Sequence, residues 1–388
     1  MAATPLDRDQ FAVTRRFRYL NHASMGSLPR TAADAGTRFV EEHATGGGVR
    51  LAEWEGEAEV VRARAAQLLG VPVDDVAFVK NTTEGLAFVA NGLTWSPGDR
   101  VLVPDREFPT TVYPWLALRD RGVEVDLLEP VGAGWTVPLE RIDEHLRTRP
   151  ARLVAISWVH YARGWRTDLA ALAALCHRHG ALLCVDAIQG VGVVPADFEA
   201  WGVDFATADA YKWMLGPLGT GVLYVAERHR NDLRPLEPGW ASVAGRDDFD
   251  HLDLVYADSA RRFEGGSLTI GAIVQMGASI DLLLESGVAA VWRHVEELTD
   301  HLAAGLADAG ATVLSDRSAA GRSAIVSFAM DGHDPGTIVE GLRTAGVVCS
   351  ARGGGVRVSP HGYTTVADVD ELLAVVRSLR TGRSVGSG

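Results

Sequence analysis

Apolar runs of strand length alternate with helix-like segments from about residue 55 to about residue 225. The strand-like runs are DDVAFV, DRVLVPD, VEVDLLEP, RLVAISWV, ALLCVDAI and TGVLYVA, while DLAALAALCHRHG has helical spacing and ends at a glycine. Continuous apolar strands are buried on both faces, and their alternation with helices is typical of parallel sheets. The pattern therefore predicts an α/β fold with a mostly parallel sheet covered by helices.

A different order of elements follows after about residue 260. Two long helical patterns, AIVQMGASIDLLLESG and VAAVWRHVEELTDHLAAGLADAG, precede a strand-like SAIVSFAM, a shorter helix, a strand pair around VVCSARGGGVRVSP and a last helix. This order predicts a second, smaller α/β domain. We therefore predict an N-terminal arm over residues 1–20, a large domain over 21–260, a small domain over 261–380 and a disordered tail over 381–388.

Charge and composition limit the partners of the chain. A net charge of −13 over 388 residues argues against nucleic acid or an anionic membrane surface. The N-terminus carries charges where a signal peptide requires an apolar run, and no stretch approaches the roughly 18 uncharged apolar residues of a membrane span, so we expect a cytoplasmic protein. Its three cysteines are too scattered for a disulfide framework or a zinc site, and we expect no bound metal.

Polar residues stand directly after several of the apolar runs, where ligands bind in sheets of this type. Asn81, Thr82 and Thr83 lie between a strand and a helix, and N–H groups at a helix N-terminus suit a phosphate. The alternative is an ordinary helix cap. The run LLCVDAIQG ends in Asp186 and then Gln189. A carboxylate there requires a positive partner, unless Asp186 only caps a helix.

Lys212 lies between Tyr211 and Trp213, ahead of the glycine-rich GPLGTG. Apolar surroundings lower the pKa of a lysine, and a neutral amine attacks an aldehyde to form a Schiff base, whereas an exposed lysine would need no such explanation. Arg352 and Arg357 flank a triple glycine and suit a carboxylate, although they could also be surface charges. Together, a phosphate site, an acid, a reactive lysine and an arginine are what pyridoxal phosphate requires to act on an amino acid.

The chain resembles the class V aminotransferases of fold type I, a family that also contains cysteine desulfurases, selenocysteine lyases, kynureninase and isopenicillin N epimerase-like enzymes. The resemblance rests on NTTEG, VDAIQG, ADAYKWMLGP, RFEGGS and RVSPHGY, and it extends from YLNHASMGSLP to the last helix. It implies the fold of a pyridoxal-phosphate-dependent transferase, with a mostly parallel seven-stranded sheet in the large, cofactor-binding domain and a smaller C-terminal α/β domain.

The resemblance also implies a role for each residue that matches the motifs. Lys212 holds the cofactor as an internal aldimine, Asp186 pairs with its pyridine nitrogen, and Gln189 bonds its phenolic oxygen. Thr82 and Thr83 bind the phosphate.

Further cofactor contacts are implied around these residues. Tyr211 and Phe108 belong to the cofactor site; Phe108 stands where desulfurases have a histidine, so it can stack on the ring but cannot move a proton. Ser267 reaches the phosphate of the neighbouring subunit, which makes the enzyme a homodimer with shared sites. Asp209 stands where the family often has serine. Because an acid beside a phosphate is unfavourable unless it points away, we expect no contact from Asp209.

The substrate side of the site carries further implied residues. Arg357 binds the substrate carboxylate, and Asn21, His22 and Arg163 are assigned to the substrate pocket. His160 stands where relatives have asparagine or glutamine near the ring, so it is either a second proton donor or a hydrogen-bonding spacer.

These residues leave the reaction open, because elimination, epimerisation and transamination all begin with removal of the α proton by Lys212. Desulfuration requires a nucleophilic cysteine on a mobile loop, whereas CSARGGGVR is too short for such a loop and Cys349 lies in a strand-like run. We therefore expect a carbon–sulfur lyase that eliminates a β substituent from a cysteine conjugate or sulfoxide. The alternatives are an amino-acid epimerase, an aminotransferase or, in another class, a non-catalytic protein that binds pyridoxal phosphate.

Overall fold

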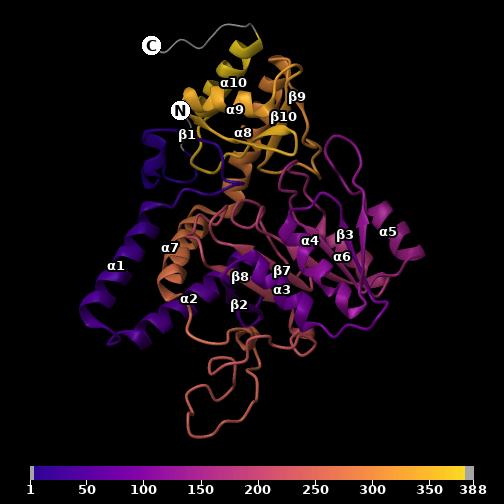
Figure 1. Cartoon of the computed structure of the whole chain (residues 1–388). Coiled ribbons are helices and arrows are strands. Elements are labelled where there is room, and N and C mark those ends of the chain that lie inside the picture. The colour runs from indigo at the N-terminus through magenta and orange to yellow at the C-terminus, as the bar shows by residue number, and fades with distance from the viewer. Residues whose placement is uncertain (1–3, 381–388) are drawn as a thin grey trace.

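A seven-stranded sheet forms the centre of the computed structural model, which describes residues 4–380 (Figure 1). Its strands are β2 (Val76–Val79), β3 (Arg100–Pro104), β4 (Glu124–Leu128), β5 (Leu153–Ser157), β6 (Leu182–Asp186), β7 (Phe205–Asp209) and β8 (Gly221–Val225). They lie in the order β2-β8-β7-β6-β5-β3-β4, and among them only β8 runs antiparallel to its neighbours. The predicted α/β fold with a mostly parallel sheet is confirmed. The predicted tail, residues 381–388, lies outside the described residues.

The direction of β8 follows from the short connection that precedes it. A parallel neighbour requires a crossover of about a dozen residues or more, usually a helix, whereas the chain turns back directly within residues 210–220. In this turn the amide of Gly216 donates to the carbonyl of Ala210 at 2.8 Å, and Leu215 is fully buried with a left-handed φ of 59°. Burial therefore holds the backbone of this connection, which carries Lys212, in one strained conformation.

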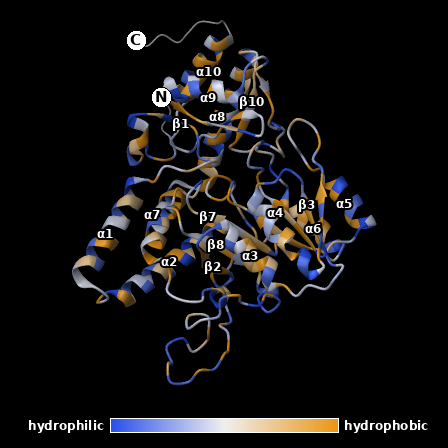
Figure 2. Ribbon diagram, in the orientation of Figure 1, coloured by the Kyte–Doolittle hydropathy of each residue, from blue (hydrophilic) through white to orange (hydrophobic). Residues whose placement is uncertain are grey.

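Residues of one strand alternate between the two faces of the sheet, and hydrophobic side chains pack on both faces. In β5, Val154 and Ile156 pack on one face, whereas Leu153 and Ala155 pack on the other. This alternation explains why the strand-like runs are apolar at every position. Figure 2 shows hydrophobic residues concentrated in the central elements and hydrophilic residues along the outer loops.

Seven helices belong with this sheet: α1 (Arg30–Gly46), α2 (Leu51–Leu69), α3 (Thr82–Gly92), α4 (Pro109–Leu116), α5 (Leu139–Thr148), α6 (Leu169–Arg178) and α7 (Ile270–Ser286). The long helix α7 packs closely against α1 and α2 (Figure 1). Gly277 permits the close approach to α2, because a Cβ at this position would lie only 2.3 Å from the side chain of Val61. Within residues 4–380 no single helix is both long and apolar enough to cross a membrane. Helix α7 and the helix that follows it, α8 (Val288–Asp308), meet that test only as a pair, and they are bent by 78°.

A second core lies in the C-terminal part of the chain. An antiparallel sheet in the order β12-β13-β10-β9 consists of β9 (Thr312–Val313), β10 (Val326–Ala329), β12 (Ser350–Arg352) and β13 (Gly355–Val358). Helices α8 (Val288–Asp308), α9 (Pro335–Thr344) and α10 (Val366–Arg380) complete it. Leu302 and Leu306 of α8 pack in this core with Phe328. These elements correspond to the predicted small α/β domain, whereas α7, which the predicted bounds of 261–380 include, packs against α1 and α2.

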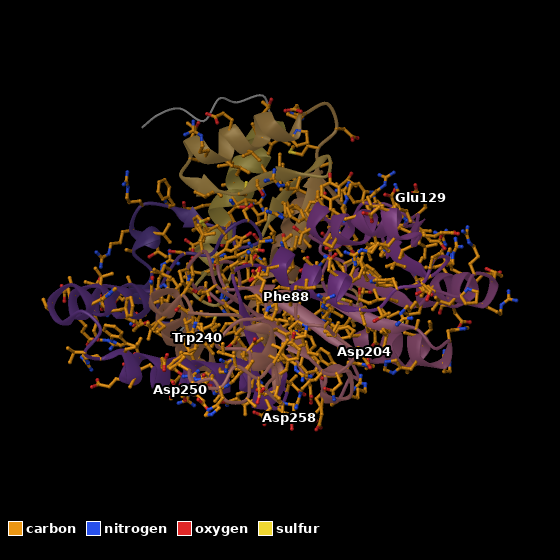
Figure 3. The ribbon with its side chains drawn as sticks, turned by 60° about the horizontal axis from the view of Figure 1, so that its bottom comes forward. Phe88, Glu129, Asp204, Trp240, Asp250 and Asp258 are labelled. Carbon is orange, nitrogen blue, oxygen red and sulfur yellow. The ribbon has the colours of Figure 1, made fainter. Side chains whose placement is uncertain are left out.

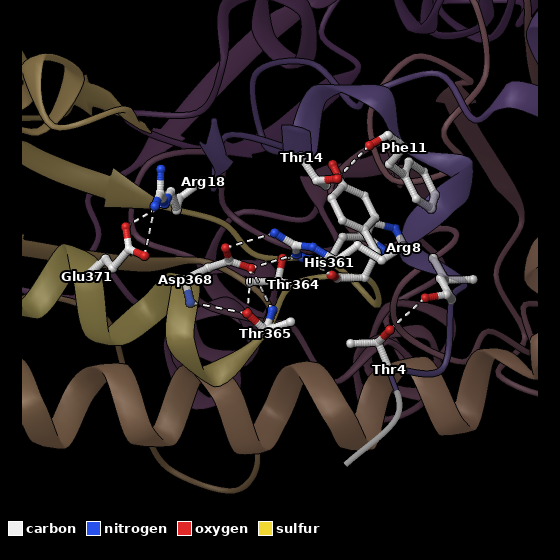
Figure 4. A network of polar contacts seen from close by, with 12 residues as sticks. Thr4, Arg8, Phe11, Thr14, Arg18, His361, Thr364, Thr365, Asp368 and Glu371 are labelled. Atoms are coloured by element: carbon white, nitrogen blue, oxygen red, sulfur yellow. Dashed lines mark hydrogen bonds and ion pairs between the residues drawn. The ribbon is translucent and has the colours of Figure 1, made fainter. Parts of the chain in front are cut away.

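The N-terminal arm packs against this second core and pairs with one of its strands. Strand β1 (Arg18–Tyr19) pairs in parallel with β11 (Val347–Val348), and the next residue, Leu20, is fully buried in the second core. Arg8 forms a bidentate ion pair with Asp368 of α10, at 2.7 and 3.0 Å, as Figure 4 shows. The two ends of the described chain therefore lie side by side.

A long connection between β8 and α7 extends beyond the body of the protein, away from the small domain (Figure 1). Figure 3 shows Trp240, Asp250 and Asp258 of this segment at one side of the molecule. Several of its large apolar side chains are exposed, Phe249 by 72% and Leu252 by 93%. An exposed apolar surface of this kind is typical of an interaction site.

Candidate active site

A cavity of about 310 Å³ opens at the carboxyl ends of β6 and β7, beside the N-terminus of α3. Six of the predicted site residues line it: Thr82, Thr83, Phe108, Asp186, Tyr211 and Lys212. They come from four separate parts of the sequence, which the parallel strands bring to one edge of the sheet. A ligand site is expected at this edge in open α/β sheets.

Lys212 is buried at the base of this site, with 7% of its surface exposed. Its Nζ lies 5.7 Å from the ring centroids of both Phe108 and Tyr211. The Nζ atom of Lys212 forms no hydrogen bond and no ion pair with any of the described residues. Burial lowers the pKa of Lys212 to about 8, although the negative charge of Asp186 opposes the shift. A substantial fraction of this amine is therefore neutral near physiological pH.

Backbone contacts with the segment around Gly26 also hold Lys212 in place. Gly26 lies so near that a Cβ on it would be 2.2 Å from the carbonyl oxygen of Lys212. The amide of Gly26 also donates to the carbonyl of Tyr211 at 2.7 Å. The segment after β1 therefore covers the lysine, and only glycine fits at this approach.

Asp186, the last residue of β6, is held by two hydrogen bonds. The Thr111 hydroxyl donates to its Oδ2 at 2.9 Å, and the Ile188 amide donates to its Oδ1 at 3.1 Å. Burial raises the pKa of Asp186 to about 6, against the opposing effect of the Lys212 charge. A buried carboxylate at the cavity is suited to a cationic group of a ligand.

Helix α3 points its N-terminus at the cavity. Asn81 is its N-cap and accepts a hydrogen bond from the Glu84 amide at 2.9 Å, so the cap predicted as the alternative is also present. Gly85 allows the helix to approach β7, because a Cβ there would lie 2.2 Å from Thr207 Oγ1. The first N–H groups of a helix have no acceptor within it. The two interpretations of this segment are therefore compatible.

Asp209 also lines this cavity. It is the last residue of β7, and 7% of its surface is exposed. Asp209 reaches the cavity because it stands at the end of β7, where the connection to β8 begins. Its side chain contacts Thr82 at the start of α3, which also lines the cavity.

Gln189 and His160 are near the site but do not line the cavity. Gln189 donates from Nε2 to the carbonyl of Ala23 at 3.0 Å, and its Oε1 accepts from the indole of Trp213 at 2.8 Å, which leaves its second amide N–H for a ligand. Both ring nitrogens of His160 contact the backbone: Nε2 lies 3.0 Å from the carbonyl oxygen of Arg106, and Nδ1 accepts from the Arg163 amide at 3.1 Å. This geometry favours the spacer alternative for His160.

Arg357, on β13, is buried with 2% exposure and has no carboxylate partner among residues 4–380. Its guanidinium donates to the Tyr161 carbonyl at 2.7 Å and to Ser24 Oγ at 2.5 Å. Burial lowers its pKa to about 10, and its charge in turn lowers the pKa of Lys212. Arg163 instead braces the small domain, since it donates to Ser327 Oγ and to the Gly353 carbonyl.

Three other predicted residues lie outside the cavity. His22 is fully buried between the Ser359 carbonyl and the Tyr363 hydroxyl, so both of its ring nitrogens are used. Asn21 has a buried, unpaired side-chain oxygen but does not line the cavity. Ser267 is exposed and lines a separate cavity next to Trp240.

Sequence reasoning did not single out Thr111 and Glu107. Thr111 orients Asp186, and Glu107 accepts hydrogen bonds from the amide and hydroxyl of Ser157 at 2.9 and 2.6 Å. Burial raises the pKa of Glu107. Their place in DREFPTTVYPW, directly after an apolar strand, is the sequence signal that could indicate them.

Comparisons with known proteins agree with this arrangement. The family model described as aminotransferase class-V matches residues 18–372. A probable cysteine desulfurase of Methanothermobacter thermautotrophicus is 31% identical over 91% of this chain and 92% of its own length.

Solved structures show the same fold. The apo structure of a cysteine desulfurase from Thermococcus onnurineus has a TM-score of 0.88 at 22% identity, over 99% of this chain and all of that one. The cystine C–S lyase C-DES with its product cysteine persulfide has a TM-score of 0.86 at 24% identity, covering 95% and 99% of the chains. A C-DES variant with glycine covalently linked to its pyridoxal phosphate has a TM-score of 0.87 at 23% identity, covering 96% and 99%.

The family match covers both the sheet that bears Lys212 and Asp186 and most of the small domain that bears Arg357. The chain belongs to the class-V aminotransferase family and is similar to a probable cysteine desulfurase.

Proposed function

We propose that this enzyme binds pyridoxal phosphate through Lys212 and eliminates a β substituent from an L-amino acid, as a carbon–sulfur lyase acting on a cysteine conjugate or its sulfoxide. The observation that carries the proposal is a buried lysine with a pKa lowered to about 8 in a cavity that also contains a buried carboxylate and a helix N-terminus. A neutral amine, an acid and an anion site are the three features that this cofactor requires.

The residues around the cavity fit the cofactor. Lys212 is the group that would hold it covalently, Asp186 would pair with its ring nitrogen, and the face of Phe108, which is 43% exposed, would stack on its ring. The N-terminus of α3, with Thr82 and Thr83, would bind its phosphate. When bound, pyridoxal phosphate supplies an electron sink for the electrons left at the substrate α carbon.

Lys212 is also the base of the proposed reaction. Its Nζ takes the proton from the α carbon, because His160 has both nitrogens engaged and Phe108 has no titratable group. Asp186 would pair with a positively charged ring nitrogen of the bound cofactor, which would favour removal of that proton. The site suits a β substituent with a stable thiolate or sulfenate form, because such a group can leave without a proton from the protein.

Arg357 is proposed to bind the substrate carboxylate. A buried guanidinium without a carboxylate partner among the described residues is costly, and a substrate carboxylate would satisfy it bidentately. Ser24 and the Tyr161 carbonyl hold the guanidinium in place. Arg357 does not itself line the cavity, and Arg163 braces the neighbouring hairpin at Gly353.

A second candidate function is cysteine desulfuration, because the relative from Methanothermobacter is named a probable cysteine desulfurase. That reaction requires an accessible nucleophilic thiolate. Cys349 is 8% exposed, lies between β11 and β12, and has its pKa raised to about 12 by burial. These properties favour elimination over desulfuration by Cys349.

The experiment is product analysis by mass spectrometry after incubation with L-cysteine, cystine and cysteine S-conjugates, with and without borohydride reduction. Lys212 and Lys80 are the only lysines in the sequence, so Lys80→Ala is the matched control for Lys212→Ala. We expect the reduced cofactor on Lys212, and pyruvate with ammonia from the conjugates. A racemised amino acid or a transaminated product would instead identify an epimerase or an aminotransferase, and an adduct on Lys80 would refute the proposal.

The enzyme is further proposed to be a homodimer in which Ser267 completes the partner's phosphate site. Ser267 is exposed beside Trp240, in the same connection between β8 and α7 that exposes Phe249 and Leu252. A stable obligate interface of this kind buries more than roughly 2,000 Å². Light scattering would test it, since a monomer that binds pyridoxal phosphate tightly would contradict the placement of Ser267.

A further inference from the structure

One carboxylate oxygen in the cavity has no partner. Asp209 Oδ2 accepts a hydrogen bond from the Thr82 hydroxyl at 3.1 Å, whereas Oδ1 is buried and unpaired among the described residues. The side chain is held in this position, because Thr82 Oγ1 also accepts a hydrogen bond from the Asp209 amide at 3.0 Å. A buried polar atom without a partner is costly, so it indicates a ligand group that is its partner.

The surroundings of Oδ1 favour an anionic ligand. The N-terminus of α3 begins at Thr82, which contacts Asp209 directly, and both residues line the cavity. Unpaired N–H groups and the helix dipole attract a phosphate to this position. An ionised carboxylate in the same place would repel the phosphate, whereas a protonated one would donate a hydrogen bond to it.

We infer that Asp209 is a neutral carboxylic acid when the phosphate of the cofactor is bound, and that it shares its proton with a phosphate oxygen. The inference rests on the proposed function, because the phosphate is that of the proposed cofactor. The proton comes from the solvent. Binding of pyridoxal phosphate therefore takes up one proton at Asp209, and Asp209 acts as a positioning residue for the phosphate.

The charged and titratable groups around Asp209 are consistent with this proton uptake. They are Lys212 and Tyr211 on the following connection, Asp186 at the end of β6, and Lys80 ahead of α3. Lys80 is ion-paired with Glu84 at 2.7 Å, and the register partner of Asp209 on β8 is Gly221. Burial raises the pKa of Asp209 to about 6, with the hydrogen bonds from Thr82 and the charge of Lys212 opposing it. A phosphate dianion would raise that pKa further.

The pH dependence of binding follows from these groups. Above pH 6 the cofactor-free protein has Asp209 ionised, while the loaded protein has it protonated, so a proton must be taken up for binding. The Kd for pyridoxal phosphate should therefore rise with pH, by about tenfold per unit for one proton. Below pH 6 the carboxyl is neutral before binding, and its contribution to the pH dependence disappears.

The experiment compares wild type with Asp209→Asn, which keeps the shape and a donor but cannot ionise. Kd values for pyridoxal phosphate and for pyridoxal, which lacks the phosphate, are measured from pH 6 to pH 9. We expect the ratio of wild-type to variant Kd to increase about tenfold per unit above pH 7 for pyridoxal phosphate and to stay constant for pyridoxal. The charge of Asp209 also raises the pKa of Lys212, so the pyridoxal ratio is the reference for this change, because pyridoxal reacts with the same amine but has no phosphate.

A second measurement needs no variant. Calorimetry of the wild type at pH 8 in buffers of different ionisation enthalpy should show about one more proton taken up with pyridoxal phosphate than with pyridoxal. Equal pH slopes in wild type and variant, or equal proton uptake with the two ligands, would overturn the role of Asp209. In that case a borohydride adduct on Lys212 would still support the proposed function, whereas failure to bind pyridoxal phosphate at all would overturn both.

Discussion

The imidazole of His361 donates a hydrogen bond from Nε2 to the backbone carbonyl of Trp213, over a distance of 3.0 Å. His361 follows β13 of the small domain, and Trp213 directly follows Lys212. The Nδ1 atom of the same ring accepts from the Gly362 amide at 2.7 Å, so both nitrogens are used and the ring is neutral. Burial lowers the pKa of His361 to about 4. The small domain thus fixes the backbone next to the lysine of the candidate site.

Replacing His361 should destabilise the protein. His361→Ala removes a fully buried ring and leaves the Trp213 carbonyl without its donor, so we expect the free energy of unfolding to fall by about 2 to 4 kcal/mol. Urea denaturation measures the change. His251→Ala is the control, because His251 lies in an exposed part of the long connection and should change stability by less than about 0.5 kcal/mol. Equal effects of the two substitutions would contradict this role for His361.

Asp186→Asn should stabilise the cofactor-free protein while abolishing its proposed function. Folding raises the pKa of Asp186 to about 6 from about 3.9 in the unfolded chain, so ionisation opposes folding as the pH rises through this range. At pH 7.5 the variant should gain about 2 to 3 kcal/mol, and below pH 4 this gain should vanish. Thermal unfolding at both pH values tests the sign. Asp247→Asn, at an exposed site, is the matched control.

Covalent capture of pyridoxal by Lys212 should follow the ionisation of its amine. Because burial lowers the pKa of Lys212 to about 8, the capture rate in the cofactor-free protein should rise about tenfold per pH unit below pH 8 and level off above it. Stopped-flow absorbance gives the rate. Lys80→Ala should leave this profile unchanged, and a profile that still rises at pH 10 would show that Lys212 is not desolvated.

Arg357 and Cys349 separate elimination from desulfuration. Removing a buried partner of a carboxylate costs about 2 to 5 kcal/mol, so Arg357→Ala should lower kcat/KM by at least tenfold while the cofactor spectrum stays unchanged. Cys349→Ser should have little effect on turnover, because elimination needs no enzyme thiol. Loss of activity in Cys349→Ser, together with a persulfide on Cys349 in the wild type, would make desulfuration the reaction.

The strands and the central site residues could be predicted because each depends on local sequence. The six apolar runs correspond to six of the seven strands, all except β7, since both faces of the sheet are buried. Asp186 and Thr82 stand directly after such runs, Lys212 follows β7, and the ends of neighbouring strands meet at one cavity. These relationships need only the spacing along the chain.

The direction in which a side chain points could not be predicted from local sequence. The sequence predicts His22 as a substrate residue, whereas its ring contacts Ser359 and Tyr363. These partners lie more than 300 residues away in the sequence, so no local pattern indicates them. Thr111 was missed because its function depends on the distance between α4 and β6. Asp209 lines the cavity because α3 approaches β7 closely, which is a property of the packed protein.

The parallel pairing of β1 with β11 also has a consequence for the time course of synthesis. Arg18 and Val347 are register partners, so the first strand has no pairing partner until nearly the whole chain has left the ribosome. At roughly 5 to 20 residues per second, adding about 330 residues takes on the order of 20 to 60 seconds. During that interval the apolar residues of the arm are without their final cover. Chaperone binding to nascent chains should therefore begin at the arm and end only when the last helix emerges.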